Sequence, residues 1–297
     1  MHDFMSAIGF AGIKNKSDLR RLIKDAIEDP TEVFMTPCGM ESAFGGISKA
    51  YADQIGLMVM GEFSQDADLE PEYEFPYIKG RQITTTEETS IEKVADKEAY
   101  VGVCDEVHVG VSLIFQLLNV KDYMNYMMRH KDSQGRWTVR LSGLSVSGKI
   151  ILPVMKDEQQ RAQGIRDTKN RNKMIAAARN GDQEAIESLT LEDIDLYTTI
   201  SRRAKSEDIL TIVESYFMPY GIAYDQYSVM GDILSVDLLK NVYTGEEVWR
   251  MCLDCNDLVF DVCINKENLM GEPEVGRRFR GSVWLQGIVD FENEFEN

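Results

Sequence analysis

The feature that most constrains the fold is a change in the spacing of apolar residues along the chain. Apolar residues tend to alternate over residues 43–154 and again over 220–291, whereas residues 156–216 carry helical spacing. Alternation predicts strands with one buried face, and a spacing of 3.6 residues predicts helices. Because the strands are grouped rather than interleaved with helices, the pattern predicts an α+β fold with antiparallel sheets.

These stretches divide the chain into three units. We expect an antiparallel α+β domain with flanking helices over residues 1–155, a helical connector over 156–218 and an OB-like β-barrel domain over 219–297. A length of 297 residues is enough for about two domains that each bury their own core.

Two helices and several strands are predicted in the first unit. The first helix begins at Ser17 as N-cap and stops at Asp29-Pro30, because a residue before proline avoids the α region. Its apolar stripe consists of Leu19, Leu22, Ile23, Ala26 and Ile27. A second helix is predicted over residues 120–130. Residues 107–115 are predicted as one long strand, and 137–143 and 149–154 as two strands that a turn at Ser147-Gly148 joins.

The connector is predicted to be helical and to change charge along its length. Residues 156–180 contain seven Lys or Arg and three Asp or Glu, whereas residues 181–200 contain six acids and no basic residue. Asn180-Gly181 is expected to end the basic segment. Thr190 and Asp193 resemble a capping box, and Ser206 is a further candidate N-cap.

The last unit reads as a small open barrel. A long strand over residues 227–240 contains Gly231, a residue typical of a bend or bulge, and it is followed by strands over 248–253, 258–264 and 279–291. An OB fold has five strands, whereas four are evident here.

Two motifs that suggest cofactor chemistry fit structural roles better. Gly143 to Lys149 has the spacing of a phosphate-binding loop, but Ile150 replaces the Ser or Thr that holds magnesium, and a strand follows rather than a helix. Cys252 and Cys255 form a C-x-x-C pair without four zinc ligands or a following helix, so we interpret them as structural thiols, with metal or redox roles as weaker alternatives.

Two acidic clusters are weak candidates for metal binding or catalysis. Asp254, Asp257 and Asp261 surround a turn but lack the spacing of a calcium loop, and Asn-Asp is ordinary turn chemistry. The His–carboxylate cluster of residues 105, 106 and 108 is the candidate site of an enzyme of unrecognised type, although no nucleophile motif accompanies it.

Basic and aromatic residues give a candidate nucleic-acid surface, because OB modules hold single strands through phosphate contacts and base stacking. The candidate contact residues are Lys169, Arg171, Lys173, Arg277, Arg278, Arg280, Trp249 and Trp284. A net charge of −18, to which residues 221–297 contribute −9, disfavours this function without excluding a local basic site.

The sequence also bears on compartment and cofactors. The chain starts without a basic and then apolar leader, no apolar stretch approaches the ~20 residues that span a bilayer, and its five cysteines are scattered. We expect a cytoplasmic protein with reduced thiols, no membrane association, no cofactor and no metal.

Five long segments resemble an uncharacterised bacterial protein family. They are CDEVHVGVSLIF at 104–115, SLTLEDID at 188–195, SYFMPYG at 215–221, DCNDLVFDVCIN at 254–265 and GEPEVGRRF at 271–279. The resemblance is to a domain-of-unknown-function family of clostridia-like Gram-positive bacteria, and it covers nearly the whole chain. It implies a cytoplasmic bacterial protein and supplies no activity, cofactor or catalytic residue.

We therefore expect a non-enzymatic binding or assembly protein that acts through protein–protein contacts, with another protein or itself as partner. The alternatives are single-stranded nucleic-acid binding by the barrel and the basic connector, and an enzyme of unrecognised type.

Overall fold

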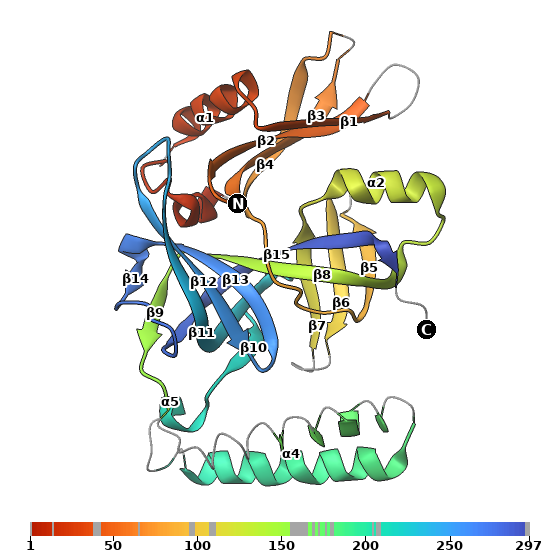
Figure 1. Cartoon of the computed structure of the whole chain (residues 1–297), viewed down its shortest axis with the longest axis vertical. Coiled ribbons are helices and arrows are strands. Elements are labelled where there is room, and N and C mark those ends of the chain that lie inside the picture. Colours follow the sequence, from red (N-terminus) through yellow and green to blue (C-terminus); the bar gives the residue numbers. More distant parts are fainter. Residues whose placement is uncertain are drawn as a thin grey trace.

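The computed structural model describes most of the 297 residues (Figure 1). The residues outside this description are 1, 14, 38–42, 65, 95–98, 107–110, 155–165, 168–169, 172, 176, 179–180, 204, 206–208 and 295–297. In the described part, the fold is mostly β with a few helices, and the strands form a four-stranded antiparallel sheet and a large mixed sheet.

The first sheet is built by the N-terminal part of the chain. A 3-10 helix, η1 (His2–Ile8), and helix α1 (Lys16–Glu28) precede strands that pair in chain order. These strands are β1 (Glu32–Pro37), β2 (Ala43–Ala52), β3 (Ile55–Phe63) and β4 (Leu69–Ile78). Helix α1 is confirmed and ends at Asp29, but its N-cap is Asn15, whose side chain accepts a hydrogen bond from the Asp18 amide, and not Ser17.

The large mixed sheet takes strands from both sides of the helical connector. Before the connector lie β5 (Glu88–Lys93), β6 (Tyr100–Glu106), β7 (Val111–Leu117), helix α2 (Val120–Arg129), β8 (Gln134–Ser145) and β9 (Gly148–Ile151). After it lie β10 (Tyr216–Pro219), β11 (Gln226–Lys240), β12 (Glu247–Cys255), β13 (Leu258–Asn265), η2 (Lys266–Asn268), β14 (Leu269–Met270) and β15 (Arg278–Glu294).

Strand pairing closes one ring of five strands around the C-terminal strands. Strands β11, β12 and β13 form an antiparallel meander, β11 also pairs with β15, and β15 pairs with β8. The ring is completed by a parallel pairing of β13 with β8, in which Asp261 lies opposite Ser142. We call this the C-ring; the fifth strand, which the C-terminal sequence lacked, comes from before the connector.

A second ring of five strands has the same plan. Strands β5, β6 and β7 form an antiparallel meander, β5 pairs with β8, β8 pairs with β15, and β15 pairs in parallel with β7. We call this the N-ring. The long strands β8 and β15 therefore belong to both rings, and Figure 1 shows them running between the two meanders.

The strands before the connector match the expectations in part. Of residues 107–115, expected as one strand, 111–115 lie in β7, and 107–110 lie outside the described residues. The two strands expected over 137–143 and 149–154 are present as β8 and β9, with a short connection between Ser145 and Gly148. They do not pair with each other, because both pair with β15, one after the other along the same edge. Gly148 is required there because a Cβ would lie 2.4 Å from the Phe279 ring.

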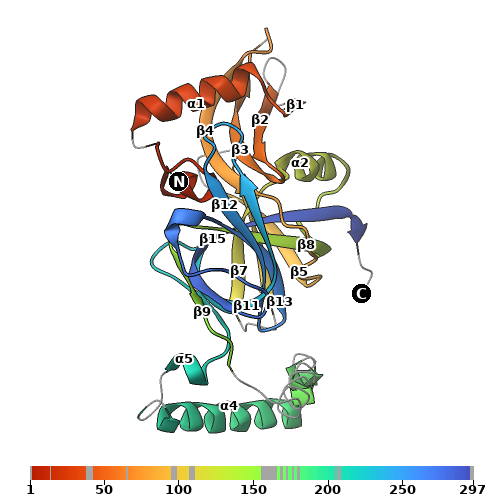
Figure 2. The same cartoon turned by 60° about the vertical axis from the view of Figure 1, so that its left-hand side comes forward.

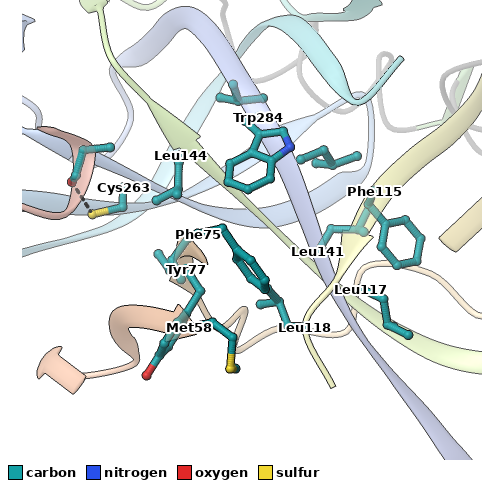
Figure 3. Close-up of a cluster of buried hydrophobic side chains, with 14 of the residues drawn as sticks. Met58, Phe75, Tyr77, Phe115, Leu117, Leu118, Leu141, Leu144, Cys263 and Trp284 are labelled. Atoms are coloured by element: carbon teal, nitrogen blue, oxygen red, sulfur yellow. Dashed lines mark hydrogen bonds between the residues drawn. The ribbon is translucent and has the colours of Figure 1, made fainter. Parts of the chain in front are cut away.

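A shared hydrophobic cluster joins the four-stranded sheet to the rings (Figure 3). Phe75 from β4 packs edge-on against Trp284 from β15, with ring centroids 6.2 Å apart. Gln286 of β15 is fully buried and makes two hydrogen bonds to the backbone of β4, because its Oε1 accepts from the Ile78 amide and its Nε2 donates to the Pro76 carbonyl. The two sheets are therefore held together by apolar packing and by buried hydrogen bonds.

The connector contains helix α4 (Gln183–Arg203) and the short helix α5 (Ile209–Ile212). Asp182 caps α4, because its Oδ1 accepts from the amides of Glu184 and Ala185. Thr190 lies inside α4 and its hydroxyl donates to the Ile186 carbonyl, so the predicted capping box was wrong. Figures 1 and 2 show α4 standing apart from both sheets.

The prediction of an antiparallel sheet with a flanking helix is confirmed for the N-terminal part, and helix α2 and the strands β11, β12, β13 and β15 lie close to their expected ranges. Residues 216–219, expected to end a helical stretch, form strand β10. Ser206 lies outside the described residues. The unit boundaries at 155/156 and 218/219 stay predictions.

Candidate functional site

Arg278 joins the C-ring to the end of the connector. Its side chain is buried, and all five of its N–H groups donate to backbone carbonyls. Two bonds go to Leu152, and the other three go to Leu210, Val213 and Glu214, over distances of 2.9–3.3 Å. The guanidinium group therefore ties the chain entering the connector to the chain leaving it.

A pocket of about 630 Å³ lies at this junction. Its walls come from residues 149–154, from Leu210 and Thr211, and from Arg278. The lining is largely apolar, and the Arg278 donors are all engaged with carbonyls. Among the described residues that line the pocket, no convergent set of polar groups marks a catalytic site.

The two neighbouring arginines have local partners. The Arg280 Nε donates to the Tyr216 hydroxyl at 3.0 Å, so it also connects β15 to the end of the connector. Arg277 donates to the Glu272 carbonyl and forms an ion pair of 2.8 Å with Glu274. The structure therefore brings Arg278 and Arg280 to residues 210–216.

The two tryptophans lie in different surroundings. Trp284 is 4% exposed, its Nε1 donates to Asp225 at 2.6 Å, and its ring contacts Phe4 and Phe75. Trp249 is half-buried, with the Lys266 ammonium 6.0 Å from its ring centroid. Trp284 therefore presents no open ring face for a base to stack on in this conformation.

Of the connector residues predicted to contact nucleic acid, Arg171 and Lys173 lie in helical segments before α4. Arg171 forms an ion pair of 3.6 Å with Glu192 of α4, and Lys173 is exposed. Lys169 lies outside the described residues. The contact role of all eight predicted residues stays a prediction.

A polar network that the sequence analysis missed covers the outer face of the C-ring meander. Asp261 on β13 is fully buried and accepts three hydrogen bonds from Arg81, from its amide at 2.9 Å, its Nε at 3.2 Å and its Nη2 at 3.0 Å. Arg81 also bonds to Asp237 on β11 at 3.0 Å.

Arg250 on β12 extends this network to the four-stranded sheet. It is 5% exposed, and it donates to Asp237 and, at 2.8 Å, to Asp53 in the turn between β2 and β3. Burial raises the pKa of Asp237, but hydrogen bonds and charge from Arg250 and Arg81 outweigh this and lower it overall. The outer face of β11–β13 is thus occupied by the chain's own N-terminal part.

The 3-10 helix η1 covers a further part of the outer face of β11–β13. The Cys263 thiol donates to the Ala7 carbonyl at 3.2 Å (Figure 3). Asn241 donates to the Ile8 carbonyl at 2.8 Å. No local sequence signal could identify these contacts, because their partners lie more than 200 residues apart in the chain.

The four described cysteines (Cys104, Cys252, Cys255 and Cys263) are buried free thiols, and Cys38 lies outside the described residues. Burial raises the pKa of Cys252 to about 11 and that of Cys255 well above its usual value. A thiol held neutral is a poor nucleophile and a poor metal ligand, which fits the structural interpretation.

The acidic clusters do not converge on a common point. Asp105 is exposed and accepts a hydrogen bond from Ser112, whereas the neighbouring Glu106 is buried on the opposite face of β6. His108 lies outside the described residues. Asp254 accepts from the Asp257 amide as part of a turn, and Asp261 is engaged with Arg81.

The described residues contain neither a metal-binding cluster nor a membrane-spanning helix. Among them, no group of three or more His, Cys, Asp or Glu could hold a metal ion. No helix in the described part of the chain is long and apolar enough to cross a bilayer.

Fold and site together define a mostly β protein in which two rings of strands share β8 and β15. The described residues of 166–178 and helix α4, joined by a turn at Gly181, form a helical hairpin outside the sheets. The chain belongs to DUF3881, a family described as a domain of unknown function with an E. rectale gene description, whose model matches residues 5–287. No curated protein and no solved structure matches the chain.

Proposed function

We propose that this protein is a non-enzymatic, cytoplasmic binding or assembly protein that acts through protein–protein contacts. The observation that carries this proposal is that the outer face of β11–β13 is occupied by Arg81, Asp53 and η1, while large apolar side chains remain exposed on α4. Exposed apolar groups on a helix that stands apart from the body favour a protein partner.

The finer fold behind this proposal is a pair of OB-like barrels that share two strands. In an OB barrel, an antiparallel meander of three strands is closed by two further strands, one of them parallel to the third strand of the meander. The N-ring follows this order, with α2 before its fourth strand. The C-ring follows the same order, with β15 and β8 in exchanged roles.

The OB interpretation also explains why nucleic-acid binding is the weaker candidate. OB modules bind oligonucleotides on the face that strands 2 and 3 present, and in the C-ring these strands are β12 and β13. Their outer face carries Arg250 and Asp261, which are already paired. On the N-ring meander, the outward-facing side chains include Glu92 and Asp105, which repel phosphate.

In-cell cross-linking of the full chain tests the proposed function. Living source cells carrying a tagged chain are treated with an amine-reactive cross-linker, and the captured material is mapped by mass spectrometry. We expect reproducible cross-links from residues 166–205 to a protein, either another species or a second copy identified by isotope labelling. Cross-links confined to single chains would contradict the proposal.

Fluorescence anisotropy separates the nucleic-acid alternative. Labelled single-stranded oligonucleotides at low salt are expected to show no saturable binding. Saturable binding that Arg280→Ala and Lys173→Ala weaken would instead favour the nucleic-acid function, because phosphate contacts carry most of such affinity.

A further inference from the structure

The face of β9 and β15 that borders the pocket carries three positive charges. Lys149 lies opposite Arg280 and Ile151 lies opposite Arg278, and side chains that lie opposite each other on paired strands share one face of the sheet. Lys149 and Arg278 line the pocket, and Arg280 is the cross-strand neighbour of Lys149. Because like charges directly opposite each other are destabilising, a negative charge bound here would relieve an unfavourable arrangement.

None of these three cations forms an ion pair within the described residues. Arg278 is 3% exposed and donates to backbone carbonyls, so its charge is buried without a carboxylate. The Arg280 Nε donates to the Tyr216 hydroxyl, and Lys149 is exposed. Asp232, which lies opposite Arg278, belongs to β11, on the other side of β15 from β9. The pocket therefore lies in a positive field that favours an anion.

The rest of the pocket suits a hydrocarbon group. Leu152 and Pro153, which follow β9, and Leu210 of α5 line it, and Figures 1 and 2 show α5 beside the end of β9. Ile151 lies two residues after Lys149 on the same face of the strand, so their Cα atoms are about 7 Å apart. The volume of about 630 Å³ lies within the range of roughly 300–1,000 Å³ of small-molecule pockets, which are mostly apolar with a few polar groups.

We propose that this pocket binds an amphipathic anion, a small molecule with one acidic head group and a hydrocarbon body. The head group, a carboxylate or a phosphate, lies between Lys149 and Arg280, and the hydrocarbon lies against Ile151 and Leu152. Arg278 contributes its charge from the buried side, and its hydrogen bonds hold the walls of the pocket together. This inference goes beyond the protein contacts of the proposed function, and each can fail without the other.

Isothermal titration calorimetry of the purified full chain tests the two parts of the ligand. The probes are octanoate and octyl phosphate in solutions free of micelles, and we expect saturable binding of at least one of them. 1-Octanol lacks the charge, and acetate and inorganic phosphate lack the hydrocarbon, so each is expected to bind at least about tenfold more weakly. Binding of octanoate alone would assign a carboxylate head group, and binding of octyl phosphate alone would assign a phosphate.

Two exposed side chains allow the pocket to be altered without loss of the fold, which circular dichroism checks. Lys149→Gln removes the charge beside the head group and should weaken binding about tenfold. Leu152→Ser removes apolar contact from a side chain that is 72% exposed and should weaken binding at least about threefold. The matched controls are Lys121→Gln on α2 and Leu191→Ser on α4, whose side chains are also exposed, and both should bind like the unmodified chain.

Hydrogen exchange with and without the bound anion locates the site. We expect slower exchange in residues 149–151 and 209–216 when the anion is present, because the ligand holds the two walls of the pocket together. Four results would overturn the proposal: no saturable binding of either anion, binding of 1-octanol as tight as that of the anions, an affinity that Lys149→Gln leaves unchanged, or slower exchange confined to other parts of the chain.

Discussion

The body of this protein, which consists of the two sheets, buries charged side chains, whereas the helical hairpin exposes apolar ones. In the body, charged side chains such as Asp261 and Arg250 are buried and paired within the chain. In the hairpin, apolar side chains such as Leu191 and Ile194 are exposed. The comparison teaches that the outer face of β11–β13 is used for contacts within the chain, whereas large apolar side chains are left exposed on α4.

The largest expected effect comes from breaking the ionic network of the body. Asp261→Ala removes the acceptor of three hydrogen bonds from Arg81. Because Arg81 is 31% exposed and keeps Asp237 as a partner, the expected cost is about 2–3 kcal/mol. Urea unfolding measures this loss. The control is Glu247→Ala, whose partner Lys266 is exposed, and it is expected to leave the free energy of unfolding nearly unchanged. Equal costs for the two variants would contradict the role of the network.

A second large effect is expected inside the N-ring. A Cβ on Gly102 would lie 2.1 Å from the aromatic ring of Phe115. Gly102→Ala therefore overpacks the interior of the N-ring and lowers the free energy of unfolding by about 1–3 kcal/mol. Gly12→Ala is the matched control, because no atom lies within 4 Å of the added methyl group. Equal midpoints of thermal unfolding for the two variants would contradict tight packing inside the N-ring.

A local effect is expected at the start of the hairpin. Asp182→Ala removes the N-cap of α4 and should destabilise this helix by about 1 kcal/mol while the body keeps its stability. Hydrogen exchange measures both regions in one experiment. Faster exchange throughout β11–β13 would contradict the independence of the two regions.

The smallest effect concerns pH. Because the pKa of Asp237 is lowered in the folded state, its contribution to stability is present above its unfolded pKa of about 3.9 and is lost as the pH falls through the lower folded pKa. Its exposed position limits this contribution to a few tenths of a kcal/mol. Asp237→Asn should remove that part of the acid dependence, as measured by unfolding from pH 7 to pH 3.

Asp225 provides the contrast, since burial raises its pKa. Its carboxylate therefore opposes folding at neutral pH, and this cost disappears on acidification. Asp225→Asn is expected to keep the bond from Trp284 and to leave stability at pH 7 unchanged or higher. A loss of stability at neutral pH would show that the charge itself is needed.

Elements whose signals are local were predictable from the sequence. The apolar stripe of α1 and the turn at Asn256-Asp257, where both residues adopt positive φ, are visible in short windows. The two ring closures were not predictable, because the parallel pairings of β13 with β8 and of β7 with β15 join distant segments. The missing fifth strand was the one sign that the C-terminal part needs a strand from elsewhere.

The sequence analysis named Arg278 and Arg280 but not the groups that they contact. Arg278 bonds to backbone carbonyls, which carry no sequence signature. The capping error at Thr190 has a related cause. Asp182, one residue before α4, caps this helix through its side-chain oxygen. The Ser/Thr-x-x-Asp pattern instead predicted a cap at Thr190, which lies inside the helix.

Hydrogen exchange on the unmodified full chain tests the contrast between body and hairpin most directly. We predict that amides in α4 exchange faster than amides in β11–β13, because α4 stands apart from both sheets whereas these strands are paired and buried. Exchange that is equally slow in α4 and in β11–β13 would contradict the account.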